Sequence, residues 1–414
     1  MFAKILFVCF VFASLVAVIS SSCRQSYVTI CDSFEDFKSY KDVENINALM
    51  IGSEYGNTKK ESIDLKGLNT INYYRYYKLT NLMIVNAIGD LQRSHATRCT
   101  YQKMALKYFT LYGNNIPKIE ENHFPNFPLK MFSLVNNKIE SIGKRAFADH
   151  KIENIDISDN LMEVIVSNSL PLTNVTKVVT IKNNKLTHIE PRSFPTSLKS
   201  LNLDGNKLRY IEEEALENLV DLQELSLSRN KFATIPKIKF LKQLLVFDIS
   251  FNEIVTIQKG TFKDMRKLKL LDLSNNNIQS PTVLEWLITP GKQPSLTISL
   301  ALNRLRDLDL QGVSLEKQSL TLYGNPWDCT TWAALKTKLS GHESRCDLEF
   351  LTKGNVPYCI NYSVTDAADL YNNTWERDIA NLREAVRKNE QNSDCTLADI
   401  RNKDLYPIDY GCVL

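Results

Sequence analysis

The sequence predicts an α/β solenoid, in which short coils stack and each coil adds one strand to a parallel sheet. Three observations support this fold class. Ten units recur at intervals of 22–27 residues, and each unit carries an asparagine in the same position. Within each unit, apolar and polar residues alternate as they do in a half-buried strand. The 414 residues are 43% apolar and 23% charged, which excludes a disordered or collagen-like chain.

The amino terminus has the pattern of a secretory signal peptide. Lys4 precedes an apolar run over residues 5–19, and Ser20, Ser21 and Ser22 follow it. The run is too short to span a bilayer, and its terminal position disfavours a core helix. We therefore assign residues 1–21 to a signal peptide, which predicts a secreted, extracellular protein whose cysteines can pair. No second long apolar segment follows, so no membrane span is expected.

The repeat begins clearly at Leu106-x-x-Phe109-x-Leu111-x-x-Asn114. Alternation sends its fourth and sixth positions inward and its third, fifth and seventh positions outward. The asparagine must enter the interior, because its amide can pair with the backbone groups of the turn after the strand. Strong units occupy residues 101–326, and weaker ones lie at 46–51 and 79–84 within an amino-terminal region of residues 22–100. The repeated asparagines are Asn114, Asn137, Asn160, Asn184, Asn206, Asn230, Asn252, Asn276, Asn303 and Asn325.

This pattern resembles the leucine-rich repeat family, and the resemblance implies a curved horseshoe with a concave parallel sheet and an asparagine ladder. It also implies a phenylalanine spine on the convex side. The segment 235–241 lacks the spine residue, and prolines around residues 282–287 of the 27-residue unit predict a short convex helix. The residues similar to the spine are Phe124, Phe147, Leu170, Phe194, Leu216 and Phe262.

The carboxyl flank resembles the cysteine-rich cap of secreted leucine-rich repeat proteins, and we assign residues 327–362 to it. The resemblance rests on residues 323–329, followed by Trp332, Leu335, Leu339 and Cys346. The family's cap begins with Cys-x-Cys, whereas Thr331 stands here in place of the second cysteine. Residues 353–360 are similar to the caps of insect leucine-rich immune proteins and of Toll-type receptor ectodomains. This similarity implies a role in insect-type innate immunity.

Eight cysteines follow the signal peptide, three before the strong repeats and five after them. A bridge between the ends is implausible, because ten coils separate the caps by roughly 45 Å and a disulfide joins Cα atoms about 6 Å apart. Cys23 and Cys31 are expected to close a hairpin cap. An odd number of cysteines lies on each side of the strong repeats, so one cysteine on each side has no partner within its own group. Either Cys99 is a buried free thiol and one tail cysteine is unpaired, or that tail cysteine forms an intermolecular bridge. The disulfide candidates are Cys23, Cys31, Cys329, Cys346, Cys359, Cys395 and Cys412.

The sequence contains no motif that indicates an enzyme, a cofactor or a metal site. It lacks the zinc-protease, serine-hydrolase and phosphate-loop motifs, and its five histidines lie in different units. With 50 Lys and Arg against 47 Asp and Glu, it also gives no basis for nucleic-acid binding. Glycosylation sequons at Asn174, Asn361 and Asn372 are consistent with a secreted glycoprotein.

Outward strand positions supply the candidate binding residues, because exposed apolar groups with polar neighbours mark partner contacts. The first group is Tyr108, Tyr112, Met131 and Val135; the second is Val246, Asp248, Leu270 and Asp272. The alternative is that neighbours half-bury these apolar residues, which then need no functional explanation. A basic lane one residue after the asparagines could attract acidic glycans or simply face solvent. It consists of Lys138, Lys185, Lys207, Lys231 and Arg304.

Residues 363–414 form a tail in which Trp375, Ile379, Leu382 and Val386 are spaced 4, 3 and 4 apart. That spacing predicts an amphipathic helix. Its apolar stripe either folds back onto the cap or meets the same or a related helix, which would give a homo- or heterodimer bridged by a tail cysteine.

These observations together predict a secreted recognition module that binds a protein or glycan on its concave face, in insect-type innate immunity by resemblance. An extracellular matrix or adhesion protein, or a developmental ligand-binding protein, is the alternative. The same scaffold serves either role.

Overall fold

We describe the protein from a computed structural model, which divides the chain into two compact units. The first holds the coils up to Leu201 together with Glu214–Leu219, and the second holds Asn202–Glu213 and the coils from Val220 onward. The structure describes residues 23–25, 29–31, 48–51, 79, 81–85, 106–121, 123–124, 128–147, 150–170, 175–288, 295–315, 318–342, 359–360 and 384.

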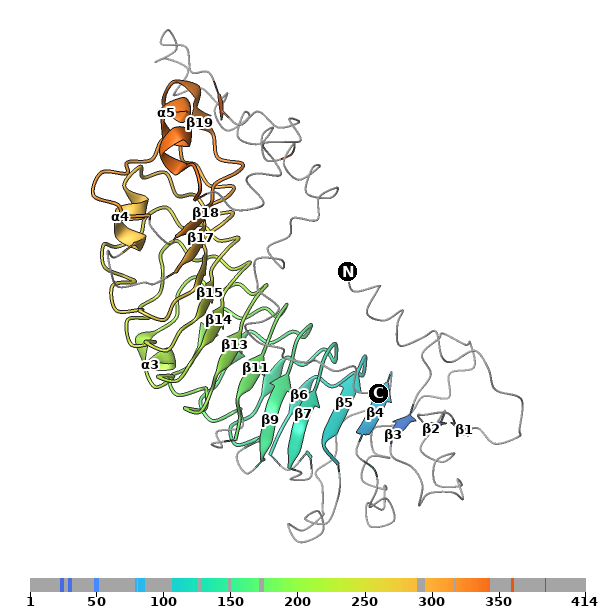
Figure 1. The fold of residues 1–414 in the computed structure, drawn as a ribbon. Helices are drawn as coiled ribbons and strands as arrows, with labels where there is room; N and C mark the ends of the chain where they lie inside the picture. Colours follow the sequence, from blue (N-terminus) through green and yellow to red (C-terminus); the bar gives the residue numbers. More distant parts are fainter. Residues whose placement is uncertain are drawn as a thin grey trace. The chain divides into compact units, whose positions relative to one another are not determined.

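The first unit is built on strands that lie side by side on one side of its coils (Figure 1). β1 and β2 are antiparallel, with Cys23 opposite Cys31, as the predicted hairpin requires. The strands from β2 to β11 pair in parallel with their neighbours, and the two weak units do contribute strands, β3 and β4. In order the strands are β1 (Cys23–Gln25), β2 (Thr29–Cys31), β3 (Ala48–Ile51), β4 (Asn81–Val85), β5 (Tyr108–Tyr112), β7 (Leu129–Ser133), β9 (Ile152–Asp156), β11 (Val178–Thr180) and β13 (Ser200–Asn202).

The second unit repeats the arrangement with five parallel strands. They are β14 (Glu224–Ser226), β15 (Val246–Asp248), β16 (Leu270–Asp272), β17 (Thr297–Ser299) and β18 (Ser319–Thr321). Two-residue strands form small parallel pairs elsewhere in the first unit: β6 (Lys118–Ile119) with β8 (Ser141–Ile142), and β10 (Val164–Ile165) with β12 (His188–Ile189).

The core lies inside the coils, where the strand alternation places apolar side chains. Leu201 and Leu203 are 1% and 0% exposed, while the intervening Asn202 is half-buried. The same inward positions are buried in the other described coils. Removing each such side chain from water contributes about 1.5–3 kcal/mol, so every coil depends on its neighbours for its stability.

The predicted asparagine ladder is confirmed, because all ten asparagines are at most 8% exposed. Asn137 shows the geometry in the first unit. Its Nδ2 donates to the Leu111 carbonyl (2.7 Å), and its Oδ1 accepts from the backbone N–H of Asn114 (3.1 Å). Its own N–H donates to Asn160 Oδ1 (2.9 Å) in the following coil. Each amide therefore pairs with backbone groups that the turn would otherwise bury unpaired.

The predicted spine residues are also buried, and in the first unit they form an aromatic cluster. The rings of Phe124 and Phe147 stack at 6.2 Å, and Phe124 meets Phe132 edge-on at 5.0 Å. In the coil without a spine residue, Ile238 is buried instead (1% exposed). The expected convex helix is α4 (Val283–Leu287), and a single turn, α3 (Glu213–Leu216), lies on the same side of its coil (Figure 1).

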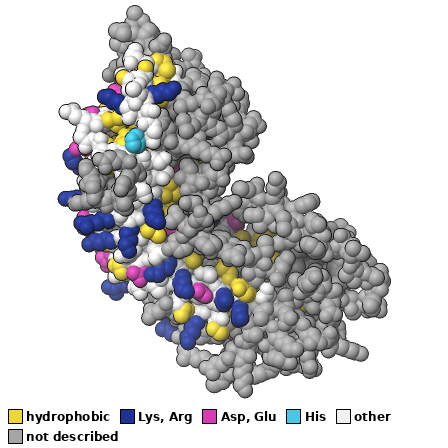
Figure 2. All heavy atoms as spheres, viewed as in Figure 1, with side chains coloured by type: hydrophobic (Ala, Val, Ile, Leu, Met, Phe, Trp, Pro, Cys, Tyr) yellow, Lys and Arg dark blue, Asp and Glu magenta, His cyan; other side chains and the backbone are white. Residues whose placement is uncertain are grey.

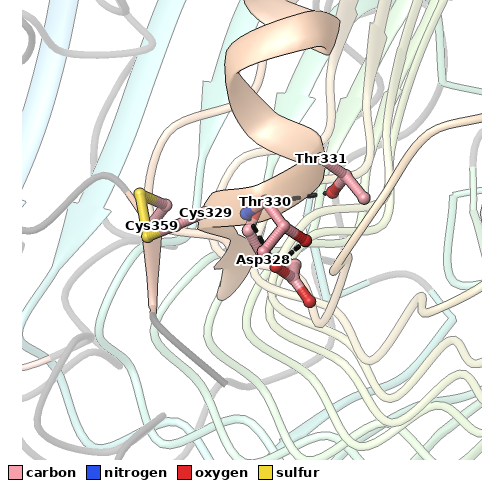
Figure 3. Close-up of a disulfide and its surroundings, with 5 residues drawn as sticks. All are labelled: Asp328, Cys329, Thr330, Thr331 and Cys359. Carbon is pink, nitrogen blue, oxygen red and sulfur yellow. Dashed lines mark hydrogen bonds between the residues drawn. A yellow bond between two sulfur atoms is a disulfide. The ribbon is translucent and has the colours of Figure 1, made fainter. Parts of the chain in front are cut away.

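A short cap follows the last coil and contains β19 (Trp327–Asp328), α5 (Cys329–Leu339) and β20 (Cys359–Ile360). Asp328 caps α5 by accepting hydrogen bonds from the Thr330 N–H (2.8 Å) and hydroxyl (2.7 Å). A disulfide joins Cys329 to Cys359 with a Cα separation of 4.9 Å (Figure 3). Where the family's second cysteine would stand, the Thr331 hydroxyl donates to the Asp328 carbonyl (3.2 Å).

Candidate binding surface

The first predicted group of binding residues lies on the outer face of the sheet in the first unit. Tyr108 pairs in register with Met131 of β7, which brings two large side chains onto adjacent strands. Tyr112 is 40% exposed, while Tyr108, Met131 and Val135 are half-buried. The structure therefore brings these four residues together and leaves part of their apolar surface accessible.

Sequence reasoning missed one member of this surface, Met83 in β4. It is half-buried, and it pairs in register with Thr110, beside Tyr108 and Tyr112. The alternation within residues 81–85 could have shown it. Its coil lacks the in-register asparagine that marks the strong units. We call Met83, Tyr108, Tyr112, Met131 and Val135 the apolar patch.

Polar side chains of β9 border the apolar patch. Asn154 pairs in register with Met131, and Asp156 pairs with Ser133. The Asp156 carboxylate accepts hydrogen bonds from the Ser158 N–H (2.9 Å) and hydroxyl (2.5 Å). Burial nevertheless raises the pKa of Asp156, because removing the carboxylate from water outweighs these two bonds.

The second predicted group differs from expectation. We expected Leu270 to project outward and to contribute little to the core, but its side chain is only 5% exposed. Asp248 and Asp272 are 5% and 4% exposed, and only Val246 is half-buried. Strand alternation gives the direction of a side chain, whereas its exposure depends on everything packed around it.

The two aspartates hold the turn after their own strands. Asp248 accepts hydrogen bonds from the Ser250 N–H (3.0 Å) and hydroxyl (2.7 Å), and Asp272 accepts one from the Ser274 N–H (3.0 Å). Short acidic side chains often bond to backbone two residues later in this way. Their observed contacts therefore support the repeat itself.

Several predicted residues lie outside the described part of the chain, so the structure does not test them. They are the signal peptide, the odd cysteine Cys99, the sequons at Asn174, Asn361 and Asn372, the cysteines Cys346, Cys395 and Cys412, and the tail residues Trp375, Ile379, Leu382 and Val386.

Among the residues that the structure describes, no group of three or more His, Cys, Asp or Glu residues could hold a metal ion. Within the same residues, no helix has both the length and the apolar character needed to cross a bilayer.

Comparison with known proteins agrees with this geometry. A leucine-rich repeat model matches residues 175–232 and 238–281, and a BspA-type leucine-rich repeat model matches residues 50–169 and 95–203. The two models together cover more than half of the chain. The fold is therefore a leucine-rich repeat solenoid.

Individual relatives match about a third of the chain or less. Tsukushi-A of Xenopus laevis is 33% identical over 148 residues, which are 33% of this chain and 40% of that protein. Toll-like receptor 2 of Boselaphus tragocamelus is 34% identical over 125 residues, which are 26% of this chain and 16% of the receptor. In both cases the match spans less than half of the relative.

Solved structures extend the likeness in fold. The Drosophila Toll–Spatzle complex has a TM-score of 0.56 at 18% identity and covers 80% of this chain and 45% of its own. The mouse RP105/MD-1 complex has a TM-score of 0.51 at 18% identity and covers 72% of this chain and 59% of its own. At these identities the likeness shows a shared leucine-rich repeat fold.

Proposed function

We propose that the protein is a secreted recognition module that binds a protein partner through the apolar patch. The observation that carries this proposal is the accessible apolar surface on β4, β5 and β7, in which Tyr112 is 40% exposed. Water contact with these side chains is unfavourable, and a partner that covers them gains the free energy of their burial.

The residue types favour a protein as the partner. Tyrosine and methionine are enriched at protein interfaces, where tyrosine combines a large apolar ring with a polar hydroxyl. The patch also lies on paired strands, so little conformational freedom is lost when a partner binds. Asn154 and Asp156 on β9 supply the polar rim that such interfaces have.

Secretion is supported by two independent features. The amino-terminal run has the order of a signal peptide, and the cap contains a disulfide between Cys329 and Cys359. Disulfides persist in oxidising compartments and are rare in the cytosol. An innate-immune role is the proposal that the resemblance of residues 353–360 to the caps of insect leucine-rich immune proteins supports. A matrix, adhesion or developmental role remains the second candidate for the same surface.

The test uses the full chain, tagged and secreted from cells, to capture partners from its native extracellular fluid. Tyr112→Asp and Met131→Asp place a charge within the apolar patch, so we expect each variant to lose the captured partner. Val164→Asp is the matched control, because Val164 is 36% exposed but lies on β10, away from the patch.

Secretion yield and melting temperature show whether each variant folds. If both patch variants are folded and still capture the same protein as the parent, the apolar patch is not the binding surface. Identification of the captured protein then separates the candidate roles, because immune factors indicate the first role and matrix or cell-surface proteins indicate the second.

A further inference from the structure

One backbone position is left-handed in every strong coil. The residue directly before each ladder asparagine has a positive φ, between 50° and 69°. Glycine, asparagine and aspartate tolerate this conformation, whereas larger side chains are strained in it. The tolerant residues in the described coils are Gly113, Asn136, Asp159, Asn183, Gly205, Asn275 and Gly324.

Two adjacent coils break this rule with large, exposed side chains. Arg229 and Phe251 both have φ of 53°, and the guanidinium carbon of Arg229 lies 4.8 Å from the centre of the Phe251 ring. Phe251 is 37% exposed. A third departure, Leu302, is only 3% exposed, so core packing accounts for it. Core packing does not account for Arg229 and Phe251. Exposed residues with positive φ also occur elsewhere, at Lys138, Arg145 and Arg192, so the feature that distinguishes this pair is the contact of a cation with an aromatic ring across two coils.

Three more cations belong to the coils of this edge: Lys207 and Arg209 lie in the coil before Arg229, and Lys231 follows Arg229 by two residues. The exposed Glu253 follows Phe251 by two residues, so the cations lie on the Arg229 side of the pair. Lys207, Arg209 and Lys231 are exposed, and the neighbouring coils are joined by a hydrogen bond from the Lys231 N–H to the Leu208 carbonyl (2.8 Å). Lys207, Arg209, Arg229 and Lys231 form no ion pair with a described residue.

Lys237 and Lys239 in the same unit behave differently, because both contact the Glu213 carboxylate. Figure 2 shows Lys and Arg side chains spread over the visible face of the described coils, with acidic side chains among them. Within the described coils, Lys207, Arg209, Arg229 and Lys231 therefore lack the carboxylate contact that Lys237 and Lys239 have.

We propose that Lys207, Arg209, Arg229, Lys231 and Phe251, the turn-edge cluster, bind a linear anionic polysaccharide. Successive coils are about 4.8 Å apart, so a chain of anionic groups that runs across them meets several cations at once. Phe251 stays 37% exposed although Arg229 lies over its ring, so part of its apolar surface can pack against a sugar ring. A protein partner fits less well, because lysine is depleted from the centres of protein interfaces.

The first experiment measures binding of the secreted full-length chain to heparin, with neutral dextran as the uncharged control. Lys207→Gln/Lys231→Gln removes two cations of the cluster. Lys138→Gln/Lys185→Gln removes two cations from the same repeat position in the first unit. We expect the first variant to bind heparin roughly fivefold to tenfold more weakly than the parent, and the second to stay within about twofold.

The second experiment separates binding from folding. Arg229→Asn and Phe251→Asn place a residue that tolerates positive φ at each strained position. We expect the melting temperature to stay constant or rise while heparin affinity falls about threefold. A purely structural role would move stability and affinity in the same direction.

Several results would overturn the proposal. These are a parent that does not bind heparin, equal losses in the two Gln variants, and Asn variants that bind as the parent does. Capture of an acidic protein through the cluster without heparin binding would also overturn it. A parallel binding measurement with hyaluronan, which carries carboxylates but no sulfates, shows which anionic group of the polysaccharide the cluster recognises. Binding to both polymers indicates general anion recognition, and binding to heparin alone indicates sulfate recognition.

Discussion

The side-chain oxygen of Asn252 accepts a hydrogen bond from the backbone N–H of Phe232, 2.9 Å away and 20 residues earlier in the chain. The Asn252 amide nitrogen donates to the carbonyls of Leu227 (3.0 Å), Ile249 (3.1 Å) and Ser250 (3.0 Å). One buried side chain thus forms hydrogen bonds with backbone groups of its own coil and of the preceding coil. These bonds stabilise the stacking of the two coils.

Replacing Asn252 with leucine should strongly destabilise the second unit. The change leaves buried N–H and C=O groups without partners, at a cost of about 1–3 kcal/mol for an unsatisfied group. Thermal and denaturant unfolding measure the loss. Asn115→Leu is the control, because Asn115 is exposed and should change stability by less than about 0.5 kcal/mol. Equal effects of the two substitutions would contradict the ladder's role.

Leu270→Asp should impair folding rather than binding alone. The side chain is 5% exposed, and a carboxylate introduced there loses water without gaining a designed partner. We expect a loss of more than about 2 kcal/mol, together with a lower secretion yield. Val246→Asp, at the half-buried position paired with Leu270, should cost less. A variant at Leu270 that is secreted and melts like the parent would show that this position tolerates solvent.

Breaking the cap disulfide by Cys359→Ser should destabilise the cap. The bridge spans a sequence separation of 30 residues, and closing such a loop in the unfolded chain is worth about 3–4 kcal/mol in the chain-entropy model. Cys329→Ser should have the same effect, and the double variant should lose no more than either single one. Melting curves with and without reductant check this, since reduction should lower the melting temperature of the parent more than that of the variants.

Asp328 should make the cap sensitive to acid. The Thr330 hydroxyl and the Thr330 backbone N–H both donate hydrogen bonds to the Asp328 carboxylate. These bonds lower the pKa of Asp328. A carboxyl whose pKa is lower in the folded state than in the unfolded state stabilises the fold at pH values above its unfolded-state pKa of about 3.9. This stabilisation is lost as the pH falls through the folded-state pKa. Asp328→Asn keeps a good helix cap at neutral pH but should lose that pH dependence. Asp328→Ala should cost about 1 kcal/mol at pH 7. Unfolding measured from pH 2 to 7 compares the three proteins.

Asp156 should behave in the opposite sense. Burial raises its pKa, so the folded state disfavours the ionised form, and stability falls as pH rises above the unfolded value of about 3.9. Asp156→Asn preserves an acceptor for the Ser158 N–H and removes the charge. We expect this variant to gain stability relative to the parent at neutral pH and to match it in acid. A parent that is more stable than the variant at pH 7 would contradict the burial argument.

Much of the fold could be predicted because the repeat is a local signal. The spacing from Leu111 to Asn114 specifies a strand followed by a turn, and its recurrence specifies stacking. The apolar patch was found for the same reason, since alternation alone places Tyr108 and Met131 on the outer face. Met83 was missed because its coil has no asparagine to fix the register.

The sequence by itself determined the inward and outward directions of the side chains, the ten buried asparagines and the position of α4, because these depend on neighbours within one coil. The tertiary structure decided which outward residues stay exposed, and so buried Leu270 while leaving Tyr112 accessible. It also paired Cys329 with Cys359 and placed Arg229 against Phe251. These contacts join residues that are far apart in the chain, and only packing brings such residues within bonding distance.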